Sequence, residues 1–550
     1  MKNPIQLTRL PVAGLALALG LSFLAATAQA NPYATCLTNA AGTVSFRLNE
    51  NGATVAVIGN GGTLSNYLGV LNRGLTETNL TGSGMTGGVF QVVVAKTGSG
   101  APTLISDDTL SSLWFWSPRG VAVNRRPASP YFGRVYVGNG FPGTTTVPGS
   151  RTTGDGIYVV NADGTDAVGQ GDTERTAGLD MQTTTASMPF RLTVGEDDDM
   201  LYICNWTDTQ GNLYRTDPDV SDGTGVNVFQ TLTRTVDYLT PVGTDNNHGS
   251  IAVALVTGSL AGGNLTVWTG DEDLQTDRDA AMYNVGTECN SLWRYDIGSG
   301  SLPYNDFFTN KVVTPSIPYQ TTGGGQVLGL ARGSNGYFYY LDSRSAGAQN
   351  LLQVLGGGTN NADVLYTSLQ ASLDLGFTYD ILSNSVSCAV SPDQKYIATI
   401  RNVGIVVLIP LTDGIPDLAA RTEFSMGATS GARDIAFDAA NNLYVTCSST
   451  ERLRVYSLGQ SGKATTGSDG TFSFEIMSNV ASVTITSIAG TSLNYTGGSG
   501  ARFILLKSAN LTTARSSWTP VATNTVTPGT FTIPAVGTPP SPTFFCIRSE

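Results

Sequence analysis

The sequence is short of charge. Charged residues make up 13% of its 550 residues, about half the share of an ordinary globular chain. With so few charged side chains and 65 glycines, the composition suits strands and turns, and it excludes a coiled coil or helical bundle. The formal net charge is −12. This acidic balance excludes nucleic acid as a main partner, because affinity for phosphates comes from Lys and Arg.

Motifs that carry chemistry are also scarce. His248 is the only histidine, which excludes multi-histidine transition-metal sites. None of the six cysteines forms a CxxC pair, so zinc ribbons and thioredoxin chemistry are not supported. A G-x-S-x-G nucleophile motif is absent as well. These absences favour binding over catalysis.

Long hydrophobic runs are missing after the N-terminus. Residues 1–30 combine a basic start, an apolar run over 10–26 and an Ala-Gln-Ala site at 28–30, which predicts a signal peptide cleaved before Asn31. The run is short for the alternative of a membrane anchor. We therefore expect a secreted, periplasmic or cell-surface protein with no transmembrane segment after cleavage.

A three-strand pattern is repeated six times along the chain, every 47 to 77 residues. The first strands are expected at 120–123, 191–194, 250–253, 327–330, 386–390 and 434–437. The second strands, rich in Tyr, are expected at 134–137, 200–203, 264–268, 336–340, 395–399 and 442–445. The third strands are expected at 156–160, 211–214, 291–295, 351–354, 404–408 and 453–456.

This repeat predicts an all-β chain built on a β-propeller, whose small sheets stack radially and bury both faces. Six blades are visible, and the flanking sequence has room for a seventh. A right-handed β-helix is the alternative, although its shorter and more regular rungs fit these spacings badly. Over about 110–460 the strand rhythm, with turns such as Asn161-Ala-Asp-Gly-Thr165 and Ser391-Pro-Asp-Gln394, resembles six-bladed propellers of the NHL, YWTD and SMP-30/gluconolactonase type. The resemblance implies a fold and carries over no catalytic residue.

Two small β-sandwich modules are expected beside the propeller, which we place at 109–460. Residues 31–108 contain three apolar strands between Gly-rich turns and predict an Ig-like sandwich, resembling those of flagellar hook-cap proteins. Residues 461–550 are expected to hold a second sandwich, and 458–470 are interpreted as a flexible linker. The stretch 503–550 resembles a C-terminal module common in exported bacterial proteins.

Six cysteines follow the signal peptide, which permits three disulfides, and buried thiols are the alternative. The C-terminal module often has Tyr-Arg where this chain has Phe545-Cys546. This departure suggests a pairing of Cys546 with Cys36.

The channel mouth of the propeller is the expected ligand site, because loops from every blade converge there. Polar residues at the start of the first strands, together with an aromatic residue of a later loop, are the candidates: Arg119, Arg191, His248, Gln326, Arg433, Asp434 and Trp206. Arginine forks grip carboxylate or phosphate, which predicts an anionic ligand. The alternative is an internal network in which these arginines pair with Asp434 and other acids.

Oxygen-rich loops on the same face suit Ca²⁺, the one cofactor that the sequence suggests. The candidate metal ligands are Asn205, Asp208, Asn247, Asp271, Asp273 and Asp342. We expect a non-catalytic binding or scaffolding role toward a protein or glycan at the cell surface. The alternative is a divalent-metal-dependent lactonase or hydrolase at the channel mouth, and a third hypothesis is a purely structural surface protein.

Overall fold

A computed structural model of the chain describes most residues after the N-terminal thirty. The described residues are 31–179, 181, 188–205, 212–229, 251–271, 292–304, 311–313, 326–343, 352–356, 364–477, 483–489, 491–497, 503–509, 518–533 and 544–549. The predicted signal peptide lies outside them, so its cleavage stays a prediction.

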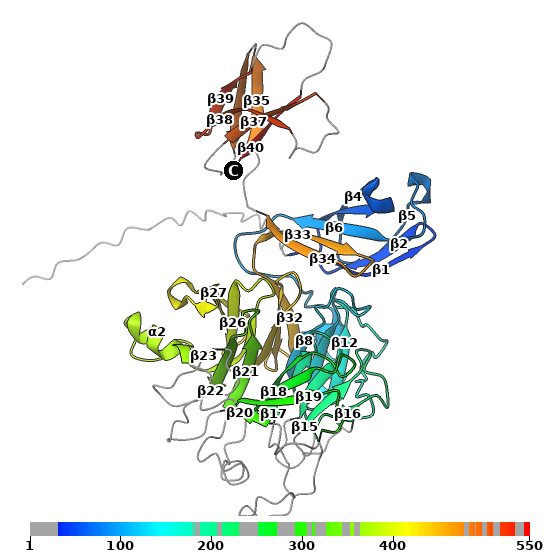
Figure 1. Cartoon of the computed structure of the whole chain (residues 1–550), viewed down its shortest axis with the longest axis vertical. Coiled ribbons are helices and arrows are strands. Elements are labelled where there is room, and N and C mark those ends of the chain that lie inside the picture. Colours follow the sequence, from blue (N-terminus) through cyan, green and yellow to red (C-terminus); the bar gives the residue numbers. More distant parts are fainter. Residues whose placement is uncertain are drawn as a thin grey trace, which may run out of the picture.

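Residues 103–457 form a β-propeller, seen in the lower half of Figure 1. The first blade contains β8 (Pro118–Val123), β9 (Val135–Asn139) and β12 (Gly156–Val160). The second contains β13 (Pro189–Val194), β14 (Leu201–Asn205), β15 (Asn212–Thr216) and β16 (Val226–Asn227). The third contains β17 (Ile251–Thr257), β18 (Leu265–Asp271), β19 (Leu292–Gly298) and β20 (Lys311–Val313).

The fourth blade contains β21 (Gln326–Arg332), β22 (Phe338–Ser343), β23 (Leu352–Leu355) and β24 (Val364–Thr367). The fifth contains β25 (Ser385–Val390), β26 (Tyr396–Arg401) and β27 (Ile405–Thr412), with β28 (Ile415–Pro416) and β29 (Thr422–Ser425) beside β27. The sixth contains β30 (Ala432–Phe437), β31 (Leu443–Cys447), β32 (Arg452–Ser457) and β7 (Thr103–Leu104). A short helix, α2 (Ser368–Asp374), connects the fourth blade to the fifth.

The predicted strand pattern is confirmed in all six repeats. The first strands of neighbouring blades contact one another around the whole ring, from β8 through β13, β17, β21 and β25 to β30 and back to β8. Among the described residues this ring closes with six blades. The possibility of a seventh blade and the alternative of a right-handed β-helix are therefore both wrong. β7 closes the ring by pairing with β32, which joins the two ends of the propeller within one blade.

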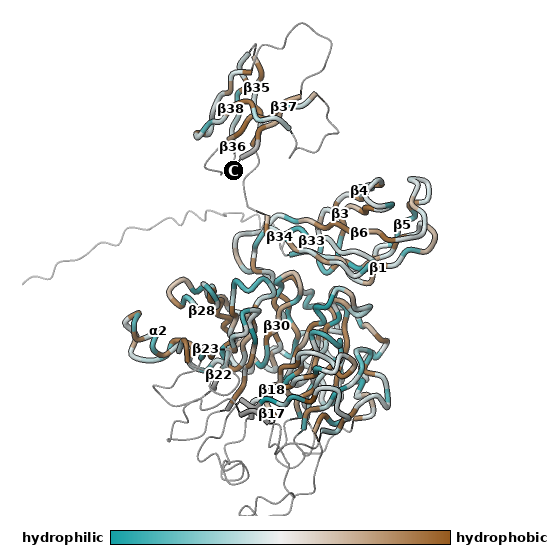
Figure 2. Tube along the Cα trace, in the orientation of Figure 1, coloured by the Kyte–Doolittle hydropathy of each residue, from teal (hydrophilic) through white to brown (hydrophobic). Residues whose placement is uncertain are grey.

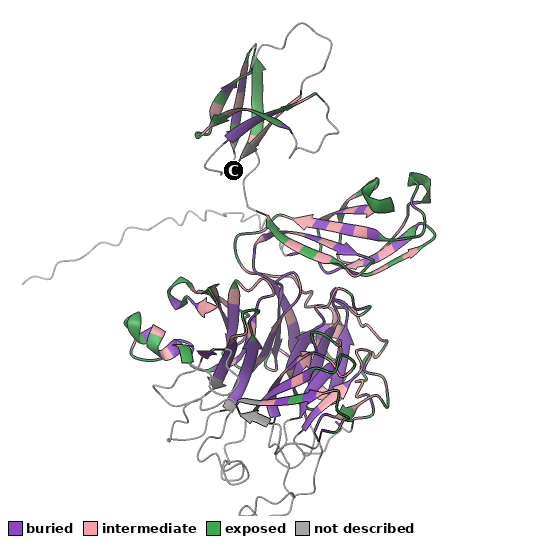
Figure 3. Ribbon diagram, in the orientation of Figure 1, coloured by how far each residue is buried: buried purple, intermediate pink, exposed green. Residues whose placement is uncertain are grey.

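Burial explains why these strands form. Each blade is covered on both faces by its neighbours, so the inner strands are mostly apolar and buried (Figures 2 and 3). The large side chain expected in the second strands lies between blades: Tyr136, Tyr202 and Tyr444 are at most 1% exposed. Each such ring removes a large apolar area from water and contributes about 1.5–3 kcal/mol.

A two-sheet sandwich lies above the propeller in Figure 1. One sheet has the order β34-β33-β6-β3-β4 and the other β1-β2-β5. Their bounds are β1 (Ala34–Ala40), β2 (Thr43–Leu48), β3 (Ala53–Gly59), β4 (Leu64–Leu71), β5 (Gly74–Asn79), β6 (Phe90–Lys96), β33 (Ser461–Gly467) and β34 (Phe472–Met477). Alternate residues of β2, β3 and β6 form its core. The sandwich is therefore observed, while its Ig-like type stays a prediction.

The propeller is inserted into this sandwich, between β6 and β33. These two strands pair directly, with Gly462 opposite Lys96. The interpretation of 458–470 as a flexible linker is therefore wrong, and the second module does not begin at 461. Small residues suit β33 because its neighbours are close: a Cβ at Gly462 would lie 2.7 Å from the Phe474 ring.

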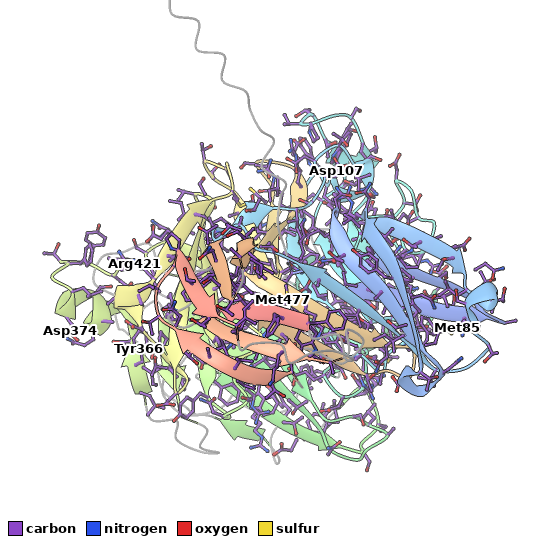
Figure 4. All side chains as sticks on the ribbon, turned by 90° about the horizontal axis from the view of Figure 1, so that it is seen from above. Met85, Asp107, Tyr366, Asp374, Arg421 and Met477 are labelled. Carbon is purple, nitrogen blue, oxygen red and sulfur yellow. The ribbon has the colours of Figure 1, made fainter. Side chains whose placement is uncertain are left out.

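The sandwich rests on the propeller through polar and apolar contacts. Arg47 pairs with Asp163 at 2.8 Å, and Arg73 pairs with Asp107, labelled in Figure 4, at 3.0 Å. Gly470 lies in the turn between β33 and β34 at φ +81°, and a Cβ there would lie 2.7 Å from the Ala128 Cα. Glycine is needed at this point because the turn and the propeller loop approach so closely.

A second sandwich follows at the C-terminus, as predicted. Its sheets are β35-β36-β39 and β38-β37-β40, and the core includes Leu493, Tyr495, Phe503 and Phe531. The strand bounds are β35 (Val483–Ala489), β36 (Ser492–Gly497), β37 (Phe503–Ser508), β38 (Thr519–Asn524), β39 (Gly529–Thr532) and β40 (Phe544–Ser549).

The cysteines of the described part include Cys36, Cys204, Cys388 and Cys447 as thiols. The suggested Cys36–Cys546 disulfide is therefore wrong, since the two residues belong to different sandwiches. Cys289 lies outside the described residues. Within the described ranges, no helix is long and apolar enough to cross a membrane.

Candidate functional site in the propeller channel

Every first strand has a β-bulge near its start, opposite the end of the second strand. The residues that follow the bulge occupy one register position in all six blades: Gly120, Arg191, Val253, Gly329, Ser387 and Asp434. Four of these are small or apolar, and the remaining two are the charged pair Arg191 and Asp434. The bulges therefore bring one arginine and one carboxylate to the same level of the channel.

Arg191 crosses the channel and joins four other blades to its own. Its guanidinium donates to the carbonyls of Arg119 at 2.8 Å, Val386 at 2.7 Å and Leu328 at 3.3 Å. All three carbonyls belong to residues at the bulges. The Nε atom lies 3.4 Å from Asp434 Oδ1, and both side chains are less than 8% exposed. Arg191 is therefore buried and connects the blades through its side chain. With Asp434 it also closes one end of the channel, and we call this pair the Arg191–Asp434 floor.

Asp434 is held from three sides. Its Oδ2 accepts from the Val121 N–H at 2.9 Å, and its Oδ1 accepts from the Ser387 hydroxyl at 2.6 Å and faces Arg191. Burial raises the pKa of this carboxyl, and Arg191, Ser387 and the Val121 N–H counteract the rise. Arg191 and Asp434 thus form the internal network that the sequence offered as the alternative to an anion site.

The other predicted channel residues are more scattered. Arg119 and Arg433 occupy the bulge position itself, and neither lines the cavity described below. The Arg119 guanidinium lies over the Phe141 ring at 5.4 Å. Burial, and then the like charge of Arg191, lowers the pKa of Arg433. Gln326 begins β21, and its side chain lies outside the described part. His248 and Trp206 lie outside the described residues.

A cavity of about 530 Å³ fills the channel beyond the Arg191–Asp434 floor. Its walls are the first strands of all six blades. Three positions after the bulge, they present Ala122, Thr193, Leu255, Ala331, Ala389 and Ala436. Four alanines in a ring of six leave the axis open and give it a methyl lining. This volume lies within the ~300–1,000 Å³ of small-molecule pockets.

The rim of the cavity is basic. Arg125 pairs with Glu196 at 3.3 Å and Arg126 with Asp199 at 3.2 Å, and all but Asp199 are substantially exposed. Arg332 is exposed and lies over the Trp268 ring at 5.3 Å, with no carboxylate partner among the described residues. In all, four arginines and two acids line the cavity. The cavity is thus net positive in a chain of net charge −12.

This rim lies on the face opposite to the one expected from the sequence. It is formed by residues after the first strands, and Phe472 of β34 in the sandwich completes it. The adjacent pair Arg125-Arg126, directly after the first strand, was a signal available in the sequence. The contribution of Phe472 was not, because it comes from a segment interpreted as belonging to another module.

Three of the predicted metal ligands occupy the same position in their blades, but the described residues do not form a metal site there. Asn205, Asp271 and Asp342 all occur at the end of second strands, opposite the bulge. The Asn205 Oδ1 accepts from the Met188 N–H at 2.7 Å, and the equivalent Asn139 accepts from Ser117 in the same way. This gives Asn205 a structural role in holding the loop.

The side chains of Asp271 and Asp342 lie outside the described part, as do Asp208, Asn247 and Asp273 altogether. Among the residues that the structure describes, no three His, Cys, Asp or Glu side chains gather as a metal site. The calcium and metal-ligand hypotheses therefore stay predictions.

No protein-family model and no curated protein matches the sequence. In structure the chain is similar to a PQQ-bound aldose sugar dehydrogenase from Streptomyces coelicolor, at 13% identity and a TM-score of 0.38, over 66% of this chain and 99% of that one. It is similar to a family AA12 carbohydrate-active enzyme from Trichoderma reesei, at 13% identity and 0.37, over 66% and 98%. The WD40 propeller domain of Doa1 aligns at 13% identity and 0.34, over 66% and 89%.

These scores are too low to support an argument about activity, and the fold assignment rests on the strand pairing itself. The strand pairing defines the class: a six-bladed β-propeller with a ligand-sized axial cavity. The fold accommodates both binding and enzymatic roles. The finer resemblance to NHL and SMP-30-type propellers stays a prediction.

Proposed function

We propose that this chain is an exported, non-catalytic binding protein whose propeller channel holds a small organic anion with an apolar body. The observation that carries the proposal is the axial cavity of about 530 Å³, with alanine-rich walls and a basic rim. Export is expected from the predicted signal peptide.

The rim supports an anionic ligand. Arg332 has an exposed guanidinium and no carboxylate partner among the described residues, so binding an anion there breaks no existing ion pair. Arg125 has an exposed partner in Glu196, and such a pair is worth only about 0–1 kcal/mol, so it can be exchanged for a ligand. Arg191 is already occupied by three carbonyls and Asp434, which directs the anionic group to the rim.

The walls support an apolar ligand body and give no reactive group. Cys388 lines the cavity, but burial, followed by the nearby Asp434, raises the pKa of its thiol to about 12, so it is not a thiolate at neutral pH. The Ser387 hydroxyl donates a hydrogen bond to Asp434 and is not free to act as a donor to a ligand. Two alternative hypotheses remain. One is a metal-dependent lactonase, and the other is binding of a protein or glycan at the opposite loop face.

The test is calorimetric titration of the purified protein with sodium decanoate, with decan-1-ol and decyltrimethylammonium as neutral and cationic analogues. We expect decanoate to bind at least about tenfold more tightly than either analogue, since a hydrogen bond to a charged group contributes about 1.5–3 kcal/mol. Arg332→Gln should remove that preference. Ala389→Leu, which fills the cavity, should weaken all three ligands.

Lys463→Gln is the matched control, because Lys463 is an exposed cation on β33 that does not line the cavity. It should bind decanoate as the wild type does. Equal affinities for decanoate and decanol, or unchanged binding in both cavity variants, would contradict the proposal.

A further inference from the structure

Asn31, the residue expected to begin the mature chain, is fully buried where the sandwich meets the propeller. Its backbone N–H donates to the side-chain oxygen of Asn442 at 3.3 Å, although the two residues are 411 positions apart. Its carbonyl accepts from Asn442 Nδ2 at 2.8 Å and from Asn49 Nδ2 at 3.3 Å. The backbone of Asn31 is therefore fixed to both parts of the molecule.

Asp438 lies on the other side of Asn442. Its Oδ2 accepts from Asn442 Nδ2 at 2.8 Å, and its Oδ1 accepts from the backbone N–H groups of Asn442 and Ala440. The carboxyl is fully buried, and no Lys or Arg of the described part pairs with it. A buried carboxylate without a cation is costly, and it calls for a positive charge nearby.

Further buried polar atoms in this cluster also have no hydrogen-bond partner among the described residues. They are the side-chain oxygen and nitrogen of Asn31. An ammonium group at Asn31 would have three N–H donors where the peptide nitrogen has one. It would supply both the missing charge and the missing donors.

We infer that the α-ammonium group released at Asn31 by signal cleavage is bound by Asn442 and Asp438 as a buried tie between sandwich and propeller. The cleavage is a hydrolysis: the Ala30–Asn31 C–N bond breaks, and water supplies the oxygen of the Ala30 carboxylate. The new amine takes up a proton and becomes an ammonium. Cleavage is expected during export, before the chain folds, so the charge is expected to be present when the junction forms. This inference does not depend on the ligand of the channel.

The first test is amine labelling of the mature, secreted protein with an acetylating succinimidyl ester at neutral pH, followed by mass spectrometry. We expect the Asn31 α-amine to react at least about tenfold more slowly than Lys395, an exposed control whose side chain is 61% accessible. In urea the protection should disappear. Native labelling as fast as that of Lys395, or a mature chain that begins at another residue, would overturn the inference.

The second test separates the charge from the packing. Asp438→Asn is made in the mature chain and in a chain with one glycine added before Asn31, which moves the ammonium away. We expect the substitution to lower the Tm by about 3 °C more in the mature chain. Glu475→Gln, an exposed acid on β34, should change neither. An equal decrease in Tm in the two chains would overturn the pairing of the ammonium group with Asp438. If Asp438→Asn does not fold, the labelling test decides.

Discussion

Replacing Arg191 tests the structural account of the channel. Arg191→Met keeps the length of the side chain but leaves Asp434 buried without its cation, and it removes the donors to three carbonyls. Breaking a buried ion pair from one side costs about 3–5 kcal/mol. With an unfolding entropy of about 2.1 cal/mol/K per residue over roughly 350 propeller residues, a loss of about 4 kcal/mol lowers the Tm by about 5 °C.

The assay is thermal and urea unfolding followed by near-UV circular dichroism, on Arg191→Met, Asp434→Asn and the double variant. Because both single changes break the same pair, the double variant should be at least about 1 kcal/mol more stable than the sum of the two losses predicts. Lys463→Gln, which breaks an exposed 3.6 Å pair, should cost less than about 1 kcal/mol. A loss below about 1 kcal/mol for Arg191→Met, or strict additivity, would refute the role of Arg191 as a tie.

Three further predictions concern the junction and the thiols. Gly470→Val should destabilise the chain by about 2 kcal/mol in urea unfolding, because position 470 has φ +81° and no space for a Cβ; wild-type stability would contradict the contact. Burial raises the pKa of Asp438 to about 7. Between about pH 4 and 7 the folded chain with the added glycine therefore binds more protons than the unfolded chain. Its free energy of unfolding should then fall as the pH rises, and Asp438→Asn should remove that fall. Ellman's reagent followed by mass spectrometry should modify the exposed Cys36 in the native protein but Cys204 and Cys447 only after unfolding; equal rates would contradict their burial.

The blades were predictable because their pattern is local. Each repeat has an apolar first strand, a turn and a second strand with a large side chain such as Tyr136 or Tyr202, and the structure confirms each of these strands. The position of Arg191 at the channel also followed from its place in the first strand. Its pairing with Asp434 was one of the two alternatives. Its other three acceptors could not be predicted, because they are backbone carbonyls whose direction depends on the bulges.

The insertion of the propeller into the sandwich was not predictable from local sequence. β33 is rich in Gly, Ser and Thr, which is the composition of a linker, and it becomes a strand because β6 offers it a free edge. This pairing joins residues more than 360 positions apart, such as Lys96 and Gly462. The same error hid Phe472 from the cavity. The candidate site was placed on the opposite face for a different reason, because the ligand was expected where the loops entering the first strands converge.

The most direct test of the central claim is a crystal structure of the protein soaked with 10-bromodecanoate, with anomalous diffraction measured at the bromine edge. The account predicts a bromine peak inside the channel, among the walls that include Leu255 and Ala389, and the carboxylate beside Arg332 at the rim. An empty channel, with bromine only on the outer surface, would contradict the claim that the cavity is a ligand site.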